Sequence, residues 1–205
     1  MKEKLLPILL SFVIFACQEQ KDSNTPKENS ETKKDSAKVA HIEPDYMKKG
    51  EEITSLVQKN LLKEVSQAIQ KNGTEGAVQY CSLNALKIMD SLSKANNCQV
   101  RRVSDKYRNE VDKAKDEVEQ EVLAAYLAEV KDKKPLQAKI VDKGTEVFYF
   151  KPIMLGMETC LKCHGKKEQI EPKTLKVIQQ LYPKDLAVNY NLKDFRGMWA
   201  VRFTK

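Results

Sequence analysis

The chain has 205 residues, a formal charge of +7 and 32% charged residues. This length allows one domain together with targeting segments. The Lys and Arg residues are spread widely and form no basic patch interleaved with aromatics, so the composition argues against a nucleic-acid-binding protein.

The N-terminus predicts export from the cytoplasm. Residues 1–16 read as a signal peptide, because a short charged start is followed by an apolar stretch, Leu5 to Ala16, that is too short for a permanent membrane helix. The segment Ile14 to Cys17 resembles a bacterial lipobox, in which Cys17 becomes the lipidated first residue of the mature protein. An ordinary signal peptide followed by an incidental Cys is the alternative.

Residues 17–44 are predicted to be a disordered tether. The stretch from Gln18 to Lys38 is almost entirely polar and cannot bury enough apolar surface to offset its ordering entropy. It would hold a domain formed by residues 45–205 away from the membrane. We expect the periplasmic side of a bacterial membrane, and Gln18, rather than Asp, after Cys17 favours the outer membrane.

Two amphipathic helices are expected after Tyr46. Asn72-Gly73 separates them, because Gly suits a left-handed helix end and Thr74 can cap the next helix. Cys81 lies on the buried stripe of the second helix. The apolar positions recur every three or four residues at Ile53, Val57, Leu61, Val65 and Ile69, and then at Val78, Cys81, Ala85, Ile88 and Leu92.

The second half of the chain alternates between strand and helix patterns. Strands are expected at 98–104, 137–141, 146–152 and 198–203, a polar loop at 105–116, and helices around Val118 to Val130 and Glu171 to Leu181. Asp142-Lys143-Gly144 is typical of a hairpin turn. Helices followed by strands predict an α+β fold with an antiparallel sheet flanked by N-terminal helices.

The segment Cys160-Leu161-Lys162-Cys163-His164 is a C-x-x-C-H motif, the attachment signature of a c-type haem. Two thiols at this spacing can each add to a haem vinyl group, and the adjacent His then serves as an axial iron ligand. The alternatives are a redox dithiol or half of a zinc site. No βαβ pattern precedes the motif, and a zinc site needs four ligands. The motif therefore predicts one covalent haem c held by Cys160, Cys163 and His164.

The second axial ligand is not fixed by the residues alone. The only other His is His41, in the predicted tether, and the Met residues at 89, 154, 157 and 198 are further candidates. Cys81 and Cys98 are left over from the motif and the lipobox. They could form a disulfide in an oxidising compartment, Cys81 could be a core residue, or its thiolate could bind iron.

Five blocks in order resemble a known family of PAS-like, single-haem c-type domains, which occur as stand-alone cytochromes and as extracytoplasmic sensor modules. The resemblance covers Tyr46 to Lys205. The blocks are Tyr80-Cys81-Ser82, then Arg101-Arg102-Val103-Ser104 with Tyr107-Arg108-Asn109, then Phe150-Lys151-Pro152-Ile153, then the haem motif with Gly165, and last Leu181 to Ala187 with Phe195-Arg196-Gly197.

The resemblance implies a PAS-like sheet and assigns roles to particular residues. Cys81 would be the distal ligand opposite His164, and Arg101, Arg102 and Arg108 would lie near the haem propionates. The chain departs from the family pattern after Asn109, where Glu110 replaces the usual Pro, and in the segment 189–193.

Three functions are open at this stage. The first is a lipid-anchored, extracytoplasmic redox or diatomic-gas sensor module that signals through a protein partner. The second is a monohaem electron carrier with a redox partner. The third, an enzyme such as a small peroxidase, is disfavoured because the domain has no second His to act as an acid–base group; we expect no enzymatic activity.

Overall fold

A computed structural model describes the backbone of residues 33–205 and the side chains from Tyr46 onward. The predicted signal peptide, the lipidated Cys17 and the first part of the tether lie outside the described residues. No helix within 33–205 is both long enough and apolar enough to span a membrane.

Helix α1 (Lys33–Ala95) consists of two arms. The predicted break is confirmed: Asn72 and Gly73 leave helical geometry, and Gly73 has a φ of 67° that suits glycine. The helix begins earlier than expected, so the prediction of disorder for residues 33–44 is wrong. Lys and Ala in this segment are strong helix formers, and polar composition opposes burial rather than helix formation.

Four antiparallel strands form one sheet in the order β1-β4-β3-β2. The predicted α+β class with an antiparallel sheet is therefore confirmed. The hairpin turn between β2 and β3 is also as expected, with Gly144 at a φ of 83° and its N–H donating to Asp142 Oδ1. The strands are β1 (Cys98–Val103), β2 (Lys139–Asp142), β3 (Glu146–Met154) and β4 (Phe195–Thr204).

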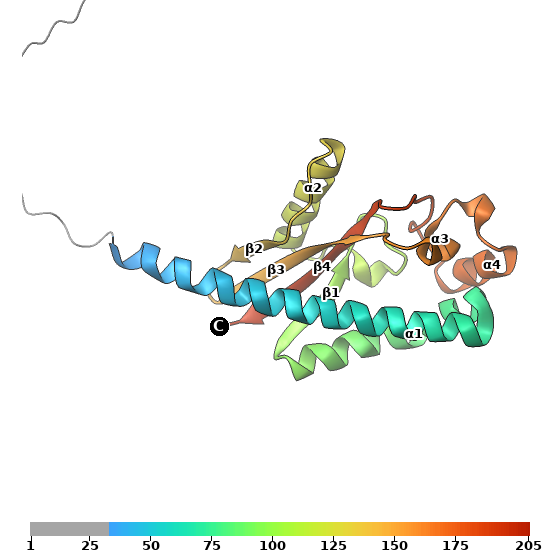
Figure 1. Ribbon diagram of the computed structural model, residues 1–205, viewed down its shortest axis with the longest axis horizontal. Helices are drawn as coiled ribbons and strands as arrows, with labels where there is room; N and C mark the ends of the chain where they lie inside the picture. Colours follow the sequence, from blue (N-terminus) through green and yellow to red (C-terminus); the bar gives the residue numbers. More distant parts are fainter. Residues whose placement is uncertain (1–32) are drawn as a thin grey trace, which may run out of the picture.

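Helices cover both faces of this sheet (Figure 1). Helix α2 (Glu117–Lys131) packs on one face, where Tyr126, Phe150 and Met198 are fully buried. The first arm of α1 packs on the other, against Tyr149 and Val201. Because apolar residues are buried on both faces, the strands read as nearly continuous apolar runs.

The short elements gather at the end of the sheet that is remote from the C-terminus (Figure 1). There α3 (Glu158–His164) and α4 (Pro172–Leu181) pack against the second arm of α1 through Val78, Ile170, Ile178 and Val188. The predicted loop after β1 contains a short 3₁₀ helix, η1 (Glu110–Asp112), and a second one, η2 (Lys167–Gln169), follows α3. These elements enclose the candidate site.

Candidate haem site

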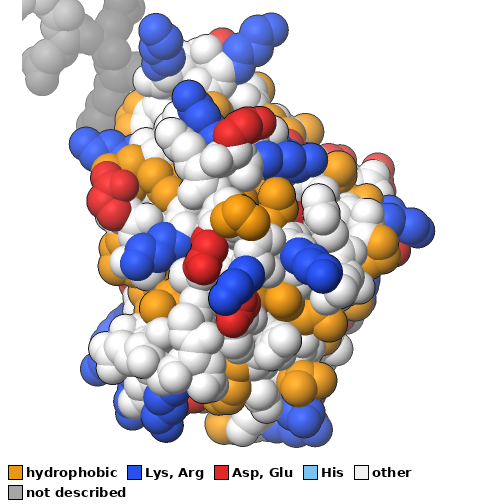
Figure 2. Space-filling model, turned by 90° about the vertical axis from the view of Figure 1, so that its right-hand side faces the viewer, with side chains coloured by type: hydrophobic (Ala, Val, Ile, Leu, Met, Phe, Trp, Pro, Cys, Tyr) orange, Lys and Arg blue, Asp and Glu red, His pale blue; other side chains and the backbone are white. Residues whose placement is uncertain are grey.

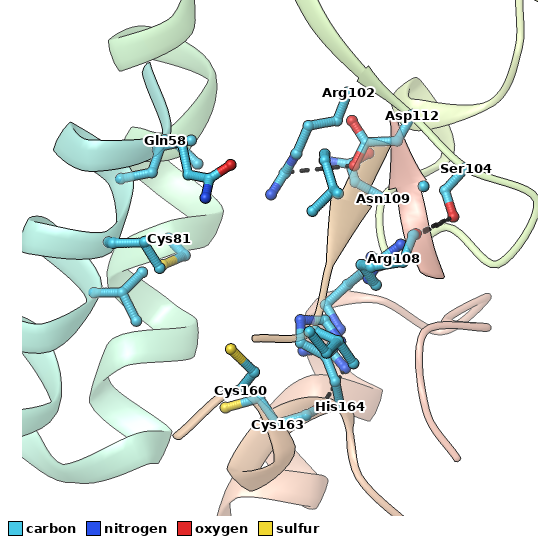
Figure 3. A pocket seen from close by; sticks show the side chains of 18 of the residues that line it. Gln58, Cys81, Arg102, Ser104, Arg108, Asn109, Asp112, Cys160, Cys163 and His164 are labelled. Carbon is cyan, nitrogen blue, oxygen red and sulfur yellow. Dashed lines mark hydrogen bonds and ion pairs between the residues drawn. The ribbon is translucent and has the colours of Figure 1, made fainter. Parts of the chain in front are cut away.

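A cavity of about 390 Å³ lies between the two arms of α1, the ends of β1 and β3, and helix α3 (Figure 3). One wall is largely apolar and comes from both arms of α1. The opposite wall carries the thiols of Cys160 and Cys163 and the imidazole of His164. The apolar wall includes Leu61, Leu62, Val65, Ile69, Ala77, Val78, Ala85 and Leu86.

Helix α3 presents the whole C-x-x-C-H motif to this cavity. A spacing of three and four residues on a helix places Cys160, Cys163 and His164 on one side. His164 Nδ1 donates to the carbonyl of Ala187 at 2.7 Å, which fixes the tautomer and leaves Nε2 available as a ligand. Burial, reinforced by the Arg108 and Arg196 guanidinium groups, holds the pKa of His164 well below its ordinary value. The imidazole is therefore neutral, as a metal ligand requires.

Cys81 faces the motif from the second arm of α1 (Figure 3). It shares the cavity with Cys160, Cys163 and His164 although it lies far from them in sequence. Burial raises the pKa of the Cys81 thiol, and Arg102 and Arg108 act in the opposite direction. The geometry thus brings together the two residues, His164 and Cys81, that the resemblance assigned to the two sides of a haem.

The alternative disulfide between Cys81 and Cys98 does not form. Both thiols are free. The helix separates the Cα atoms of Cys81 and Ala95 by about 21 Å, and the three residues from Ala95 to Cys98 reach back at most about 11 Å. A disulfide needs Cα atoms within about 7 Å of one another.

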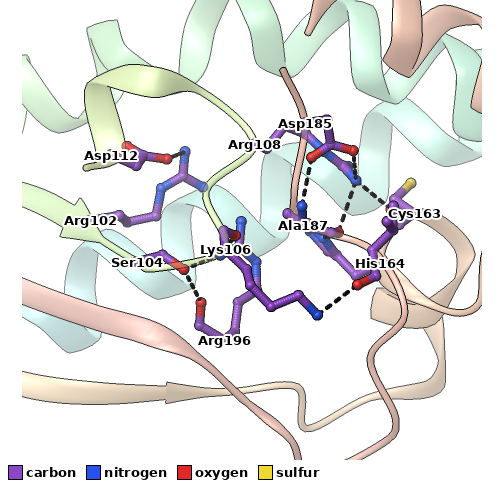
Figure 4. Close-up of polar contacts among 11 residues, drawn as sticks. Arg102, Ser104, Lys106, Arg108, Asp112, Cys163, His164, Asp185, Ala187 and Arg196 are labelled. Atoms are coloured by element: carbon purple, nitrogen blue, oxygen red, sulfur yellow. Dashed lines mark hydrogen bonds and ion pairs between the residues drawn. The ribbon is translucent and has the colours of Figure 1, made fainter. Parts of the chain in front are cut away.

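Three arginines line the other end of the cavity: Arg102, Arg108 and Arg196 (Figure 4). Arg108 donates to Asp185 Oδ1 at 3.2 Å and to the Cys163 carbonyl at 2.6 Å, so it also fixes the end of α3. Arg102 lies 3.4 Å from Asp112, but its buried Nε has no hydrogen-bond partner.

Arg196 was not identified as a site residue from the sequence. It donates to Ser104 Oγ at 2.9 Å and to the Lys106 carbonyl at 3.0 Å, and no carboxylate in residues 46–205 lies within ion-pair distance of it. Burial lowers the pKa of its guanidinium. The available signal was the Phe195-Arg196-Gly197 block of the resemblance. There Gly197 allows a close approach to β1, because an added Cβ would lie 2.4 Å from the Val103 carbonyl oxygen.

The prediction that Arg101 lies at the cofactor site is wrong. Its guanidinium pairs with Glu119 at 2.9 Å and donates to the carbonyls of Val111 and Lys113, and it does not line the cavity. Successive side chains of a strand point to opposite faces. Arg102 shares the α1 face of β1 with the cavity, so its neighbour Arg101 faces α2.

The donor set and the charges fit a haem. An unsatisfied buried Arg102 Nε and an Arg196 without a carboxylate partner are the groups that two propionates would satisfy. Two thiols and an imidazole at attachment spacing lie on one wall, and a thiol lies on the other. The apolar arms of α1 supply the surface that a macrocycle would cover.

The remaining alternatives are narrowed by placement. Met154 and Met157 line the cavity, whereas Met89 and Met198 are buried in the two cores. Within the described part of the chain, no three His, Cys, Asp or Glu residues cluster as a metal site would require. The zinc reading of the C-x-x-C motif therefore has no supporting ligands among these residues.

Fold and site together define an α+β domain with a preformed, cation-rimmed cofactor cavity. The model of the Tll0287-like family matches residues 26–204, so the chain belongs to that family. Among solved structures, the crystal structure of the cyanobacterial heme-protein Tll0287 is similar, with a TM-score of 0.61 and 26% sequence identity. The match covers 79% of this chain and 96% of the other. No curated protein matches. The predicted resemblance to a family of haem-binding domains is confirmed.

Proposed function

We propose that this protein carries one covalent haem c and acts as an extracytoplasmic, lipid-anchored sensor of redox state or of a diatomic gas, without enzymatic activity. The single observation that carries the proposal is the convergence of Cys81 with the C-x-x-C-H motif in one cavity. The similarity to a cyanobacterial haem protein supports it. Cys17 would be the lipidated residue on the periplasmic side of the membrane.

Each residue of the site has a stated role in this proposal. Cys160 and Cys163 form the thioether bonds, and His164 is the proximal ligand, oriented by its hydrogen bond to Ala187. Cys81 is the distal ligand. When bound, the haem supplies an iron that exchanges one electron and binds a small ligand wherever an axial position is open.

Arg102, Arg108 and Arg196 would bind the propionates. They also add positive charge around the site, which favours a thiolate at Cys81. Arg101, which pairs with Glu119, has no part in the site.

The signalling role depends on Cys81 being able to leave. It lies on the arm of α1 that follows the Asn72–Gly73 break, whereas His164 is held on α3 by Ala187. The two ligands therefore belong to separately supported elements. A ligand that leaves on reduction would couple the state of the iron to the position of this arm and, through the first arm, to the membrane side of the chain.

An electron carrier is the second candidate, and the charge of one face favours it. Figure 2 shows the end of the molecule that carries α3 and α4, where basic side chains alternate with apolar ones. Five exposed lysines there form no ion pair with any described residue: Lys162, Lys166, Lys167, Lys173 and Lys176. Such a face suits an acidic redox partner.

Absorption and EPR spectroscopy of both redox states, with and without CO, tests the proposal. A sensor should show thiolate ligation when ferric and bind CO when ferrous, and Cys81→Ala should lose the thiolate signature and bind CO more readily. A carrier should keep the same two ligands in both states and exclude CO. Unchanged ferric spectra in Cys81→Ala would refute Cys81 ligation.

A further inference from the structure

The second arm of α1, which carries Cys81, is fixed to the rest of the domain at its two ends. Near its start, the Thr74 hydroxyl donates to Glu171 of the segment before α4 and contacts the Thr174 hydroxyl. Near its end, the Ser93 hydroxyl accepts from the Val100 N–H of β1 at 2.9 Å. Cys81 lies between these two supports.

A hydrogen bond between the arms lies next to Cys81. The Tyr80 hydroxyl donates to Glu64 Oε2 at 2.6 Å, across a separation of 16 residues in sequence. A short bond to a carboxylate is of the charge-assisted kind, and the Glu64 carboxylate raises the pKa of Tyr80 chiefly through this bond. Glu64 belongs to the first arm and stands between Leu61 and Val65, which line the cavity.

The bond controls the rotation of the second arm about its own axis. Tyr80 and Cys81 are consecutive on a helix and point about 100° apart, so Tyr80 faces the first arm while Cys81 faces the cavity. Side-chain atoms lie roughly 5 Å from a helix axis. A rotation of about 20° therefore moves the Cys81 sulfur by about 1.7 Å, whereas metal–ligand distances tolerate about 0.2 Å.

We propose that Tyr80 and Glu64 form a positioning pair that holds Cys81 at ligand distance and sets how readily it leaves the iron. The inference rests on the proposed ligation by Cys81. The pair touches neither the motif on α3 nor the arginines, so it acts only through the arm that carries Cys81. Loss of the pair weakens the bond from Cys81 and leaves the covalent attachment of the haem intact.

The protein contains a matched control. The Tyr149 hydroxyl donates to Glu51 Oε2 at 2.9 Å, and this bond also starts from the first arm of α1. It leads to β3 and not to the second arm, and neither Tyr149 nor Glu51 lines the cavity. Tyr149→Phe removes a tyrosine–glutamate hydrogen bond of the same kind without touching the arm that carries Cys81.

The test compares Tyr80→Phe, Glu64→Ala, Glu64→Gln, Tyr149→Phe and Cys81→Ala in the haem-loaded full chain. The readouts are the ferric EPR spectrum and the apparent Kd for CO of the reduced protein. Losing one charge-assisted hydrogen bond should open the site about tenfold more often. The apparent Kd for CO should then fall about tenfold in Tyr80→Phe and Glu64→Ala, because only the open fraction binds CO.

Glu64→Gln keeps an acceptor for the Tyr80 hydroxyl and should restore most of the wild-type affinity. Tyr149→Phe should change the apparent Kd by less than about twofold. If Tyr80→Phe behaves as Tyr149→Phe does while Cys81→Ala alters the EPR spectrum, the positioning pair is refuted and the ligand stands. If Cys81→Ala also leaves the EPR spectrum unchanged, the proposed ligation itself has failed.

Discussion

The two ends of the domain differ in how completely their own side chains fill them. Toward the C-terminus, the sheet and the first arm of α1 pack Val57, Tyr149 and Val201 with no exposed surface. At the other end lies the cavity, and four large apolar side chains that line it remain 38–45% exposed: Leu62, Leu86, Met154 and Met157.

Polar groups differ between the two ends in the same way. The Tyr149 hydroxyl at the packed end donates to Glu51. At the cavity end, the buried Arg102 Nε lacks a partner and Arg196 faces no carboxylate within reach among the described residues. The comparison teaches that the sheet end is complete as a protein core, whereas the cavity end is completed by a cofactor that supplies apolar surface and negative charge.

Removing the attachment should separate the two ends most strongly. In Cys160→Ala/Cys163→Ala, haem staining of the denatured protein should be lost completely, because no thioether remains. Amide exchange should accelerate in α3, α4 and the second arm of α1, while β3 and β4 keep their protection. Equal loss of protection in the sheet would contradict the division into two ends.

Truncating the packed end should have the converse effect. Tyr149→Ala deletes a fully buried ring and should lower the free energy of unfolding by about 4 kcal/mol, measured by chemical denaturation. The folded fraction should keep the wild-type ferric absorption spectrum, because Tyr149 does not line the cavity. A changed axial spectrum would mean that the two ends are coupled.

The arginines sharpen the comparison at the level of single charges. Arg196→Gln removes a cation from the cavity and should lower the reduction potential by on the order of 60 mV, which is a tenfold change for one electron. Arg101→Gln removes a cation that faces α2 and should leave the potential unchanged. Redox titration of both variants checks this, and equal shifts would show that long-range charge rather than placement decides.

The smallest expected effect concerns the turn of the packed end. The pKa of Asp142 is held below its ordinary value by the hydrogen bond from Lys205 and then by that from the Gly144 N–H. A carboxylate with a lowered folded pKa adds stability above its unfolded pKa of about 3.9, and this is lost as the pH falls. Asp142→Asn should be slightly less stable than wild type at pH 7. Denaturation curves should converge near pH 3, and a gap that persists there would exclude the carboxylate as its cause.

Local signals allowed much of this structure to be predicted from the sequence. The C-x-x-C-H spacing identifies its site residues without knowledge of the fold, and the 3–4 periodicity locates both arms of α1 and places Cys81 on the inner stripe. The break at Asn72–Gly73 and the turn at Gly144 follow from the need for a positive φ.

The choice between Arg101 and Arg102 could not be made from the sequence. Val100 and Val103 are three residues apart and lie on opposite faces of β1, yet both are buried because helices cover the sheet on both sides. The apolar pattern of this strand therefore does not reveal which arginine faces α1. Arg196 was missed for a related reason: a charged residue near the start of a strand reads as solvated, and only the packing of β4 against β1 brings it to the cavity.

Iron X-ray absorption spectroscopy of the ferric protein tests the central claim most directly, because it counts the atoms that bind the metal. Ligation by His164 and Cys81 predicts one sulfur neighbour at thiolate bonding distance, together with the imidazole and macrocycle nitrogens. The same sulfur should disappear in Cys81→Ala and remain in Cys98→Ala. A ferric wild-type protein without sulfur in the first coordination sphere, or with a sulfur that survives Cys81→Ala, would contradict the assignment of Cys81 as the distal ligand.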